Sequence, residues 1–85
     1  MQWILGEKRY VHTTVSEGVA ASADCTVYDC EDESVVTSGV ATVSGEDLYF
    51  LWQPSEAGIY VADFLYVIGS EELSNRQIVE VKETV

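Results

Sequence analysis

Residues 59–68 decide the fold, and they read Ile59-Tyr60-Val61-Ala62-Asp63-Phe64-Leu65-Tyr66-Val67-Ile68. Successive side chains of an extended strand point to opposite faces, so Tyr60 and every second residue after it share one apolar face. The other face is also apolar, except for Asp63 in its middle. Such a strand is either central to its sheet or covered on its outer side.

The rest of the chain has the same period of two. There, no segment of helical length carries an apolar stripe at positions i, i+3, i+4 and i+7. Turn-forming residues separate six candidate strands, which are residues 8–15, 19–28, 35–43, 48–52, 59–68 and 74–83. A break at Ser38-Gly39 would divide the third of these. The pattern predicts an all-β fold of six or seven antiparallel strands, either a β-sandwich or a small barrel.

Alternation also assigns a core face to each strand. In residues 19–28 the charged Asp24 marks the solvent side, so Cys25 and its partners two residues away point inward. The predicted core is Ala23, Cys25, Val27, Phe50, Trp52, Tyr60, Ala62, Phe64, Tyr66, Val79 and Val81.

Length and composition indicate one folded domain over residues 1–85, with residues 1–7 as a possible N-terminal arm. The chain is 47% apolar and has a single proline, which is atypical of disorder. No apolar run reaches the ~18–20 residues that a membrane helix needs, and Met1–Gly6 is too short for a signal peptide. We therefore expect a protein made without export, with no membrane partner.

The charge balance restricts the partners. Fifteen acidic residues against four basic ones give a net charge of −11. Nucleic-acid binding needs a basic surface that replaces counterions, so this composition predicts that no nucleic acid is bound.

The two cysteines are predicted to be unbridged. If Cys25 to Cys30 is one continuous strand, their Cα atoms lie ~16 Å apart. A disulfide needs about 7 Å or less, so a bridge would require a turn within residues 26–29. Together with His12, the only histidine, they do not make a four-ligand zinc site.

No residue pattern indicates catalysis. His12 lies in a predicted strand without an acid or nucleophile at a suggestive spacing, and Cys25 is predicted to face inward, where a thiol is inert. We expect no enzyme, no catalytic residue, no cofactor and no small-molecule substrate. The acidic stretch Asp29–Glu33 offers oxygen ligands but lacks the spacing of a calcium loop, so no metal site is predicted and divalent-cation binding stays an open alternative.

The stretch from Trp52 to Ala62 resembles the E–F corner of immunoglobulin-like domains. There an acidic residue, a glycine or alanine and a tyrosine follow one another at alternate positions, as Glu56, Gly58 and Tyr60 do here. The resemblance implies an immunoglobulin-like sandwich in which the Tyr60 hydroxyl bonds back to the preceding turn. Ala62 stands where the family has its second cysteine, so the usual disulfide between the sheets is absent.

The layout as a whole resembles small immunoglobulin-like proteins of the head-and-tail modules of tailed bacteriophages. The matching features are Ile4-Leu5-Gly6-Glu7-Lys8-Arg9-Tyr10, Ser38-Gly39, and Ala57-Gly58-Ile59-Tyr60 followed by Phe64-Leu65-Tyr66-Val67-Ile68-Gly69-Ser70-Glu71-Glu72. Those proteins are non-enzymatic virion parts. The resemblance implies a head–tail connector, neck, capsid or tail accessory protein, made in the host cytoplasm and located in the virion.

Two apolar segments are candidate docking surfaces for protein subunits of such an assembly. Trp3, Ile4 and Leu5 form the first, and they either fold back over an edge strand or dock into a partner. Ile59, Val61, Leu65 and Val67 form the second, on one face of a single strand. The alternative is a ligand- or receptor-binding adhesion module of the same fold, with its function in the acidic loop Asp29–Ser34.

Overall fold

The chain is all-β. The structure is a computed structural model, and it describes residues 2–83. No helix occurs among these residues, and two thirds of them are in strands. The strands are β1 (Gln2–Ile4), β2 (Arg9–Thr14), β3 (Ser22–Asp29), β4 (Val35–Val40), β5 (Thr42–Ser44), β6 (Asp47–Trp52), β7 (Gly58–Ile68) and β8 (Glu71–Lys82).

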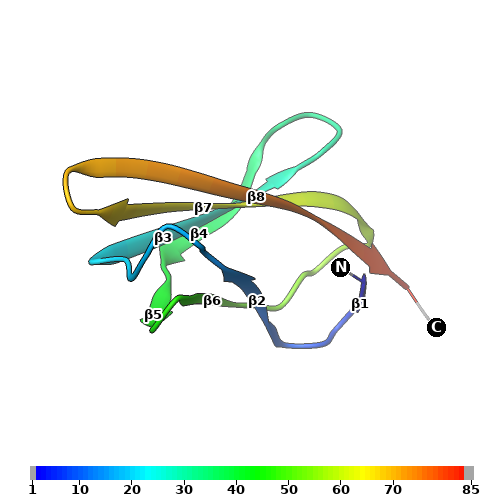
Figure 1. The fold of residues 1–85 in the computed structure, drawn as a ribbon. Coiled ribbons are helices and arrows are strands. Elements are labelled where there is room, and N and C mark those ends of the chain that lie inside the picture. Colours follow the sequence, from blue (N-terminus) through cyan, green and yellow to red (C-terminus); the bar gives the residue numbers. More distant parts are fainter. Residues whose placement is uncertain (1, 84–85) are drawn as a thin grey trace.

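These strands form two sheets in two layers (Figure 1). One has five strands in the order β1-β8-β7-β3-β4, and the other has three in the order β2-β6-β5. Every pair of neighbours is antiparallel except β1 and β8, which run parallel. The prediction of six or seven antiparallel strands therefore needs a correction, because the described residues form eight strands and the parallel one, β1, was not revealed by the sequence pattern.

The core lies between the two sheets. Period-two alternation supplies it from both layers, as in other two-layer β-proteins. All the predicted core residues are buried except Phe50, which is half-buried against the core. The sequence reading missed several core residues, which are Trp3, Val11, Val15, Ala20, Ala41 and Leu48.

Three aromatic rings close one end of this core. The Trp52 ring meets the Trp3 ring with 5.5 Å between centroids, and it meets the Tyr60 ring edge-on at 5.0 Å. The Tyr60 hydroxyl donates a hydrogen bond to the Glu56 carbonyl oxygen at 2.7 Å. This is the bond that the corner sequence predicted, and it holds the turn before β7 against the core.

Three predicted strand boundaries were wrong, and one of them is the start of β3, which lies at Ser22 rather than at residue 19. The third predicted run breaks at Ala41 rather than at Ser38-Gly39, because at Ala41 the chain leaves the five-stranded sheet for the three-stranded one. Gly39 stays in β4 and leaves room for the ring of Phe50. The last strand begins at Glu71 instead of Ser74, since Gly69 (φ 62°) and Ser70 alone make the turn.

Candidate functional site

β7 is central to its sheet, one of the two expected arrangements, and its outer face is partly exposed. Ile59 and Leu65 keep 49% and 47% of their surface accessible, and Val61 and Val67 are half-buried. The opposite face of β7 carries the buried residues from Tyr60 to Tyr66. The five-stranded sheet therefore has one face in the core and one face that is partly exposed.

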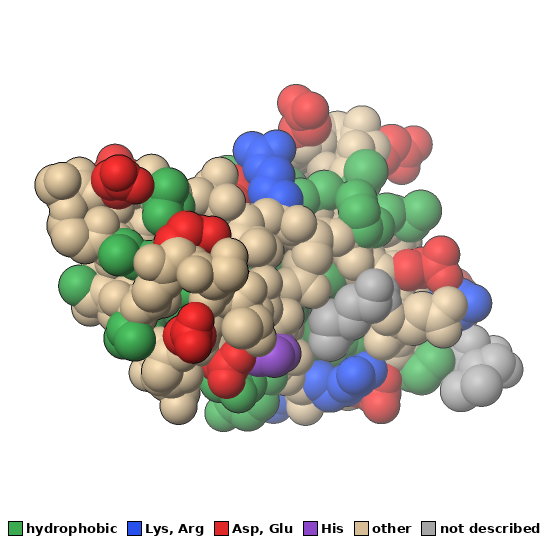
Figure 2. Space-filling model, in the orientation of Figure 1, with side chains coloured by type: hydrophobic (Ala, Val, Ile, Leu, Met, Phe, Trp, Pro, Cys, Tyr) green, Lys and Arg blue, Asp and Glu red, His purple; other side chains and the backbone are tan. Residues whose placement is uncertain are grey.

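The neighbouring strands divide this outer face into two unequal halves. Val61 lies between Tyr28 of β3 and the exposed Ile78 of β8. Ile59, two residues before Val61, is the next side chain on the same face of β7 and lies opposite Glu80 of β8. Figure 2 shows hydrophobic side chains gathered there, below the acidic side chains at the top of the view. We call Tyr28, Ile59, Val61 and Ile78 the apolar half.

The other half is flanked by polar groups. Leu65 lies between Asp24 of β3 and Ser74 of β8, and Val67 lies between Ser22 and Glu72. The expected four-residue stripe thus runs along β7 on both sides of Asp63, and it extends to both neighbouring strands only around Val61.

An ion pair separates the two halves. Arg76 Nε of β8 lies 3.1 Å from Asp63 Oδ2, and the arginine side chain stays largely exposed while it covers the carboxylate. The other carboxylate oxygen, Oδ1, is buried and has no hydrogen-bond partner among the residues that the structure describes. The cation that pairs with Asp63 therefore comes from the same chain.

A pocket of about 320 Å³ adjoins the apolar half. It is lined by Tyr28, Asp29, Cys30, Glu33, Val61 and Arg76. The loop Asp29–Ser34 stands beside the outer face of β7 and forms one side of the pocket. The Cys30 amide donates a hydrogen bond to the Ile59 carbonyl oxygen at 3.0 Å, so the loop is tied to β7.

Local hydrogen bonds shape this acidic loop. Asp29 N–H donates to the Ser34 carbonyl at 2.9 Å, and Glu33 N–H donates to the Asp29 carbonyl at 2.8 Å. The amide and hydroxyl of Ser34 both donate to Asp32 Oδ1, and these bonds lower the pKa of the Asp32 carboxyl. Glu33 occupies the left-handed region with φ 61°. The loop therefore has a defined shape, which the acidic composition alone did not predict.

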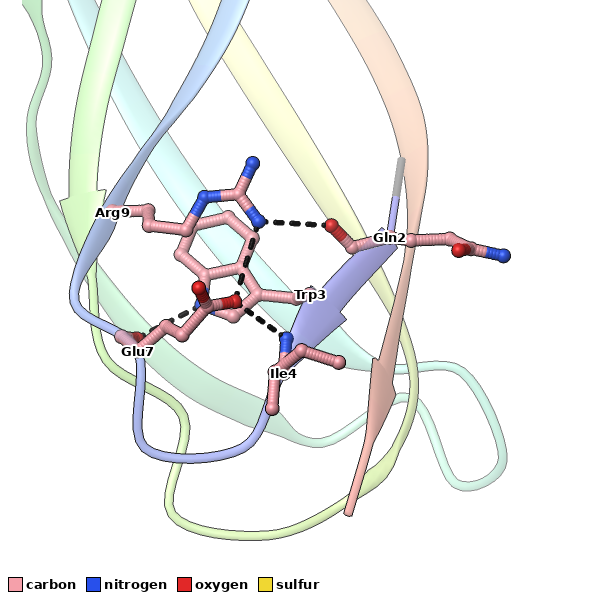
Figure 3. Close-up of polar contacts among 5 residues, drawn as sticks. All are labelled: Gln2, Trp3, Ile4, Glu7 and Arg9. Atoms are coloured by element: carbon pink, nitrogen blue, oxygen red, sulfur yellow. Dashed lines mark hydrogen bonds and ion pairs between the residues drawn. The ribbon is translucent and has the colours of Figure 1, made fainter. Parts of the chain in front are cut away.

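The N-terminal segment folds back onto the sheet, as Figure 3 shows. Trp3 is fully buried, so it is corrected from a docking residue to a core residue. Its indole Nε1 donates to the Glu7 carbonyl at 2.9 Å, and the Arg9 guanidinium lies 5.0 Å from the ring centroid. Ile4 and Leu5 are half-buried. Of the two alternatives for this segment, the structure has the one in which it covers an edge.

The sequence reading also missed the partners of His12. His12 Nε2 lies 3.1 Å from Asp47 Oδ1, and the ring stacks on Tyr49 with 4.7 Å between centroids. The Thr14 hydroxyl donates to the same carboxylate at 2.6 Å, and this bond, followed by the His12 contact, lowers the pKa of Asp47. The Thr14 hydroxyl is bonded to the Asp47 carboxylate rather than to the His12 imidazole. His12 is therefore not placed to remove the proton of that hydroxyl.

Both thiols are free, which confirms the prediction for the cysteines. Cys25 is buried and Cys30 is exposed at the pocket. Burial, with a smaller contribution from the charge of Asp63, raises the pKa of the Cys25 thiol to about 12. Within residues 2–83, no three or more His, Cys, Asp or Glu side chains are grouped so that they could hold a metal ion. None of these residues belongs to a helix that could cross a membrane.

Comparison of the chain with protein-family models, with curated proteins and with solved structures finds no match. The function therefore has to be inferred from the chain's own geometry, and the outer face of the five-stranded sheet with its adjoining pocket is the candidate site.

Proposed function

We propose that the protein is a non-enzymatic interaction module with an immunoglobulin-like fold, which docks onto a protein subunit of a larger assembly. The observation that carries the proposal is the apolar half beside the pocket, on a domain with a net charge of −11. An exposed apolar patch rimmed by polar groups is typical of protein interfaces.

The strand order supports the immunoglobulin-like part of the proposal. In such domains the strands B, E and D neighbour one another in one sheet, and C, F and G do so in the other, with an extra strand beside C in the variable type. The orders β2-β6-β5 and β8-β7-β3-β4 follow this scheme. The bond from Tyr60 to Glu56 corresponds to the tyrosine corner of these domains.

The charge supports a protein partner with a basic rim. Carboxylates around the outer face attract Lys and Arg on an approaching protein and repel phosphate backbones and anionic lipid surfaces. Electrostatic repulsion between copies of an acidic domain also keeps the protein soluble while its apolar half is not yet covered by the partner.

The sequence resemblance to small head-and-tail proteins of tailed bacteriophages suggests a virion as the assembly. Mass spectrometry of purified virions from a host that produces this chain tests that suggestion. We expect the chain in a constant ratio to the major capsid or tail subunits. Its absence from intact virions would overturn the proposal of a virion component.

Matched lysine substitutions test the docking face. Leu65→Lys and Ile59→Lys place a charge on the outer face, whereas Leu51→Lys does so on the other sheet at a leucine of similar exposure (41%). We expect all three variants to fold, and only Leu51→Lys to enter the assembly at the wild-type level. Unfolding of Leu65→Lys alone would place that face in the core, and wild-type incorporation of the two face variants would show that the face is idle.

The pocket favours a second candidate function, a ligand- or receptor-binding adhesion module of the same fold. In that case the acidic loop would make the contact, because Glu33 and Asp29 line the pocket together with Tyr28. Glu33→Gln would then reduce attachment to receptor-bearing cells while leaving incorporation unchanged. Loss of incorporation with unchanged attachment would support the docking function instead.

A further inference from the structure

One sheet edge lacks the usual protection against pairing with another strand. Sheet edges are normally very short, charged or covered, because their unpaired N–H and C=O groups invite an added strand. β4 is an edge of the five-stranded sheet, it is six residues long, and its sequence Val35-Val36-Thr37-Ser38-Gly39-Val40 carries no charge.

The other edges in the described part of the chain are protected. β1 and β5 have three residues each, and β2 carries Arg9 and His12. β1 pairs only with Glu80 to Lys82, so the rest of that edge of β8 is open, and it carries charged residues. Two side-chain hydrogen bonds also join β8 to β2. In these, Gln77 donates to the His12 carbonyl at 2.8 Å and the Thr13 hydroxyl donates to Asn75 at 3.0 Å.

The register shows which backbone groups of β4 are open. Asp24 pairs with Val40, and Ala41 N–H donates to the Ala23 carbonyl at 2.9 Å across that pair. In an antiparallel ladder this bond makes Asp24 and Val40 a non-hydrogen-bonded pair. The N–H and C=O groups of Val40, and by alternation those of Ser38, therefore point away from β3. Val40 is also 82% exposed, so its side chain offers apolar surface beside these groups.

Two further features define the chemistry of the strand that fits there. Residues 22–44 contain five carboxylates and no Lys or Arg, since the four basic residues are Lys8, Arg9, Arg76 and Lys82. A hollow of about 280 Å³ lies over the paired strands β3 and β4, lined by residues that include Asp24, Ser38 and Val40. The carboxylate of Asp24 is placed to receive a basic side chain that enters this hollow.

We propose that the open edge of β4 accepts an extended, Lys- or Arg-bearing segment of the partner protein as an added strand. This rests on the proposed docking function and names how the partner is held. Backbone hydrogen bonds at Ser38 and Val40 supply the pairing, and the carboxylates of β3 and of the acidic loop select the charge. A second copy of this chain is disfavoured because it would bring the same five carboxylates to the edge.

A synthetic peptide, Lys-Val-Thr-Val-Thr-Val-Lys, tests the proposal by amide hydrogen exchange on the full chain. We expect the saturating peptide to slow exchange at Ser38 and Val40 and to leave the amides of β2 and β5 unchanged. The same peptide with N-methyl groups on alternate residues, or with Glu at both ends, is expected to give no protection. Protection at another edge, or none with the Lys peptide, would overturn the proposal.

A pair of variants at one position isolates the backbone group. Val40→Pro removes an N–H that faces away from the ladder, and the preceding Gly39 has no side chain to clash with the proline ring. Val40→Ala keeps the N–H. We expect peptide affinity to fall about tenfold in Val40→Pro, the factor given by one lost hydrogen bond of about 1.4 kcal/mol, and to be retained in Val40→Ala.

Equal affinity in the two Val40 variants would contradict pairing through the backbone, and the N-methyl peptide keeps this question answerable if Val40→Pro unfolds. Protection that appears without peptide and grows with protein concentration would identify a second copy as the occupant and overturn the basic segment. If the peptide fails while Ile59→Lys and Leu65→Lys still block incorporation, the strand addition is wrong and the proposed docking function stands.

Discussion

Tyr60 joins the turn before β7 to the core through two different contacts. Its hydroxyl donates to the Glu56 carbonyl at 2.7 Å, and its ring packs edge-on against Trp52. Tyr60→Phe keeps the ring and removes the hydrogen bond. We expect the free energy of unfolding to fall by about 1 kcal/mol, measured by urea denaturation.

Tyr10→Phe is the control for this substitution. The Tyr10 side chain is more than half exposed, on the outer face of β2. Its loss of a hydroxyl should leave the urea midpoint unchanged. Equal midpoints for wild type and Tyr60→Phe would show that the bond to Glu56 adds no stability.

Glu17 gives a residue-scale prediction about pH. The Tyr66 hydroxyl donates a hydrogen bond to its carboxylate, and this bond, with a smaller contribution from Ser16, lowers the pKa of Glu17. A carboxyl with a depressed pKa in the folded state adds stability above its unfolded pKa of about 4.3, and that stability is lost as pH falls through the folded pKa.

Removing the donor should therefore flatten the acid side of the stability curve. We expect the urea midpoint of wild type to drop more between about pH 5 and about pH 3 than that of Tyr66→Phe, which lacks the hydroxyl. The same comparison at neutral pH sets the baseline. Parallel curves would mean that the bond does not stabilise the ionised carboxyl.

At the scale of elements, β1 is held mainly by one side chain. Its three residues pair with Glu80 to Lys82 of β8, and Trp3 is fully buried against Trp52. We expect Trp3→Ala to lower the free energy of unfolding by about 3–5 kcal/mol, the usual cost of removing a buried Trp or Phe ring. Denaturant unfolding followed by circular dichroism measures it.

Gln2→Ala is the matched control within β1, because the Gln2 side chain is exposed and its carbonyl, not its side chain, accepts the bond from Arg9. It should change the free energy of unfolding by less than about 0.5 kcal/mol. If Trp3→Ala were equally neutral, the segment would be a free arm that is available for docking.

At the scale of the whole molecule, charge and apolar surface act against each other. The net charge of −11 keeps copies apart at neutral pH, and the sequence pI is about 4.1. Near pH 4 that repulsion disappears while the outer face stays exposed. We expect light scattering to pass through a maximum near that pH, with a lower maximum for the double variant Ile59→Ser/Leu65→Ser.

Leu51→Ser controls for the general loss of an exposed leucine on the other sheet. It should scatter as wild type does or only slightly less. If it lowered the maximum as much as the double variant, association would be spread over the surface rather than centred on the outer face of the five-stranded sheet.

The sequence by itself determined the local features of this protein. The all-β class, the two faces of β7, the bond from Tyr60 to its preceding turn and the unbridged thiols of Cys25 and Cys30 were predictable. They were predictable because each depends on residues within one strand or one turn, where period-two alternation and chain geometry act directly.

Only the tertiary structure decided which strands are neighbours, and the missed contacts between distant segments depend on that. Trp3 is buried because β1 pairs with β8, His12 meets Asp47 because β2 pairs with β6, and Tyr66 reaches Glu17 across the fold. The open edge of β4 exists because β3 pairs with β4 on one side and no described strand lies on the other. A single sequence specifies alternation along each strand, whereas the pairing between strands follows from the packing of the whole core.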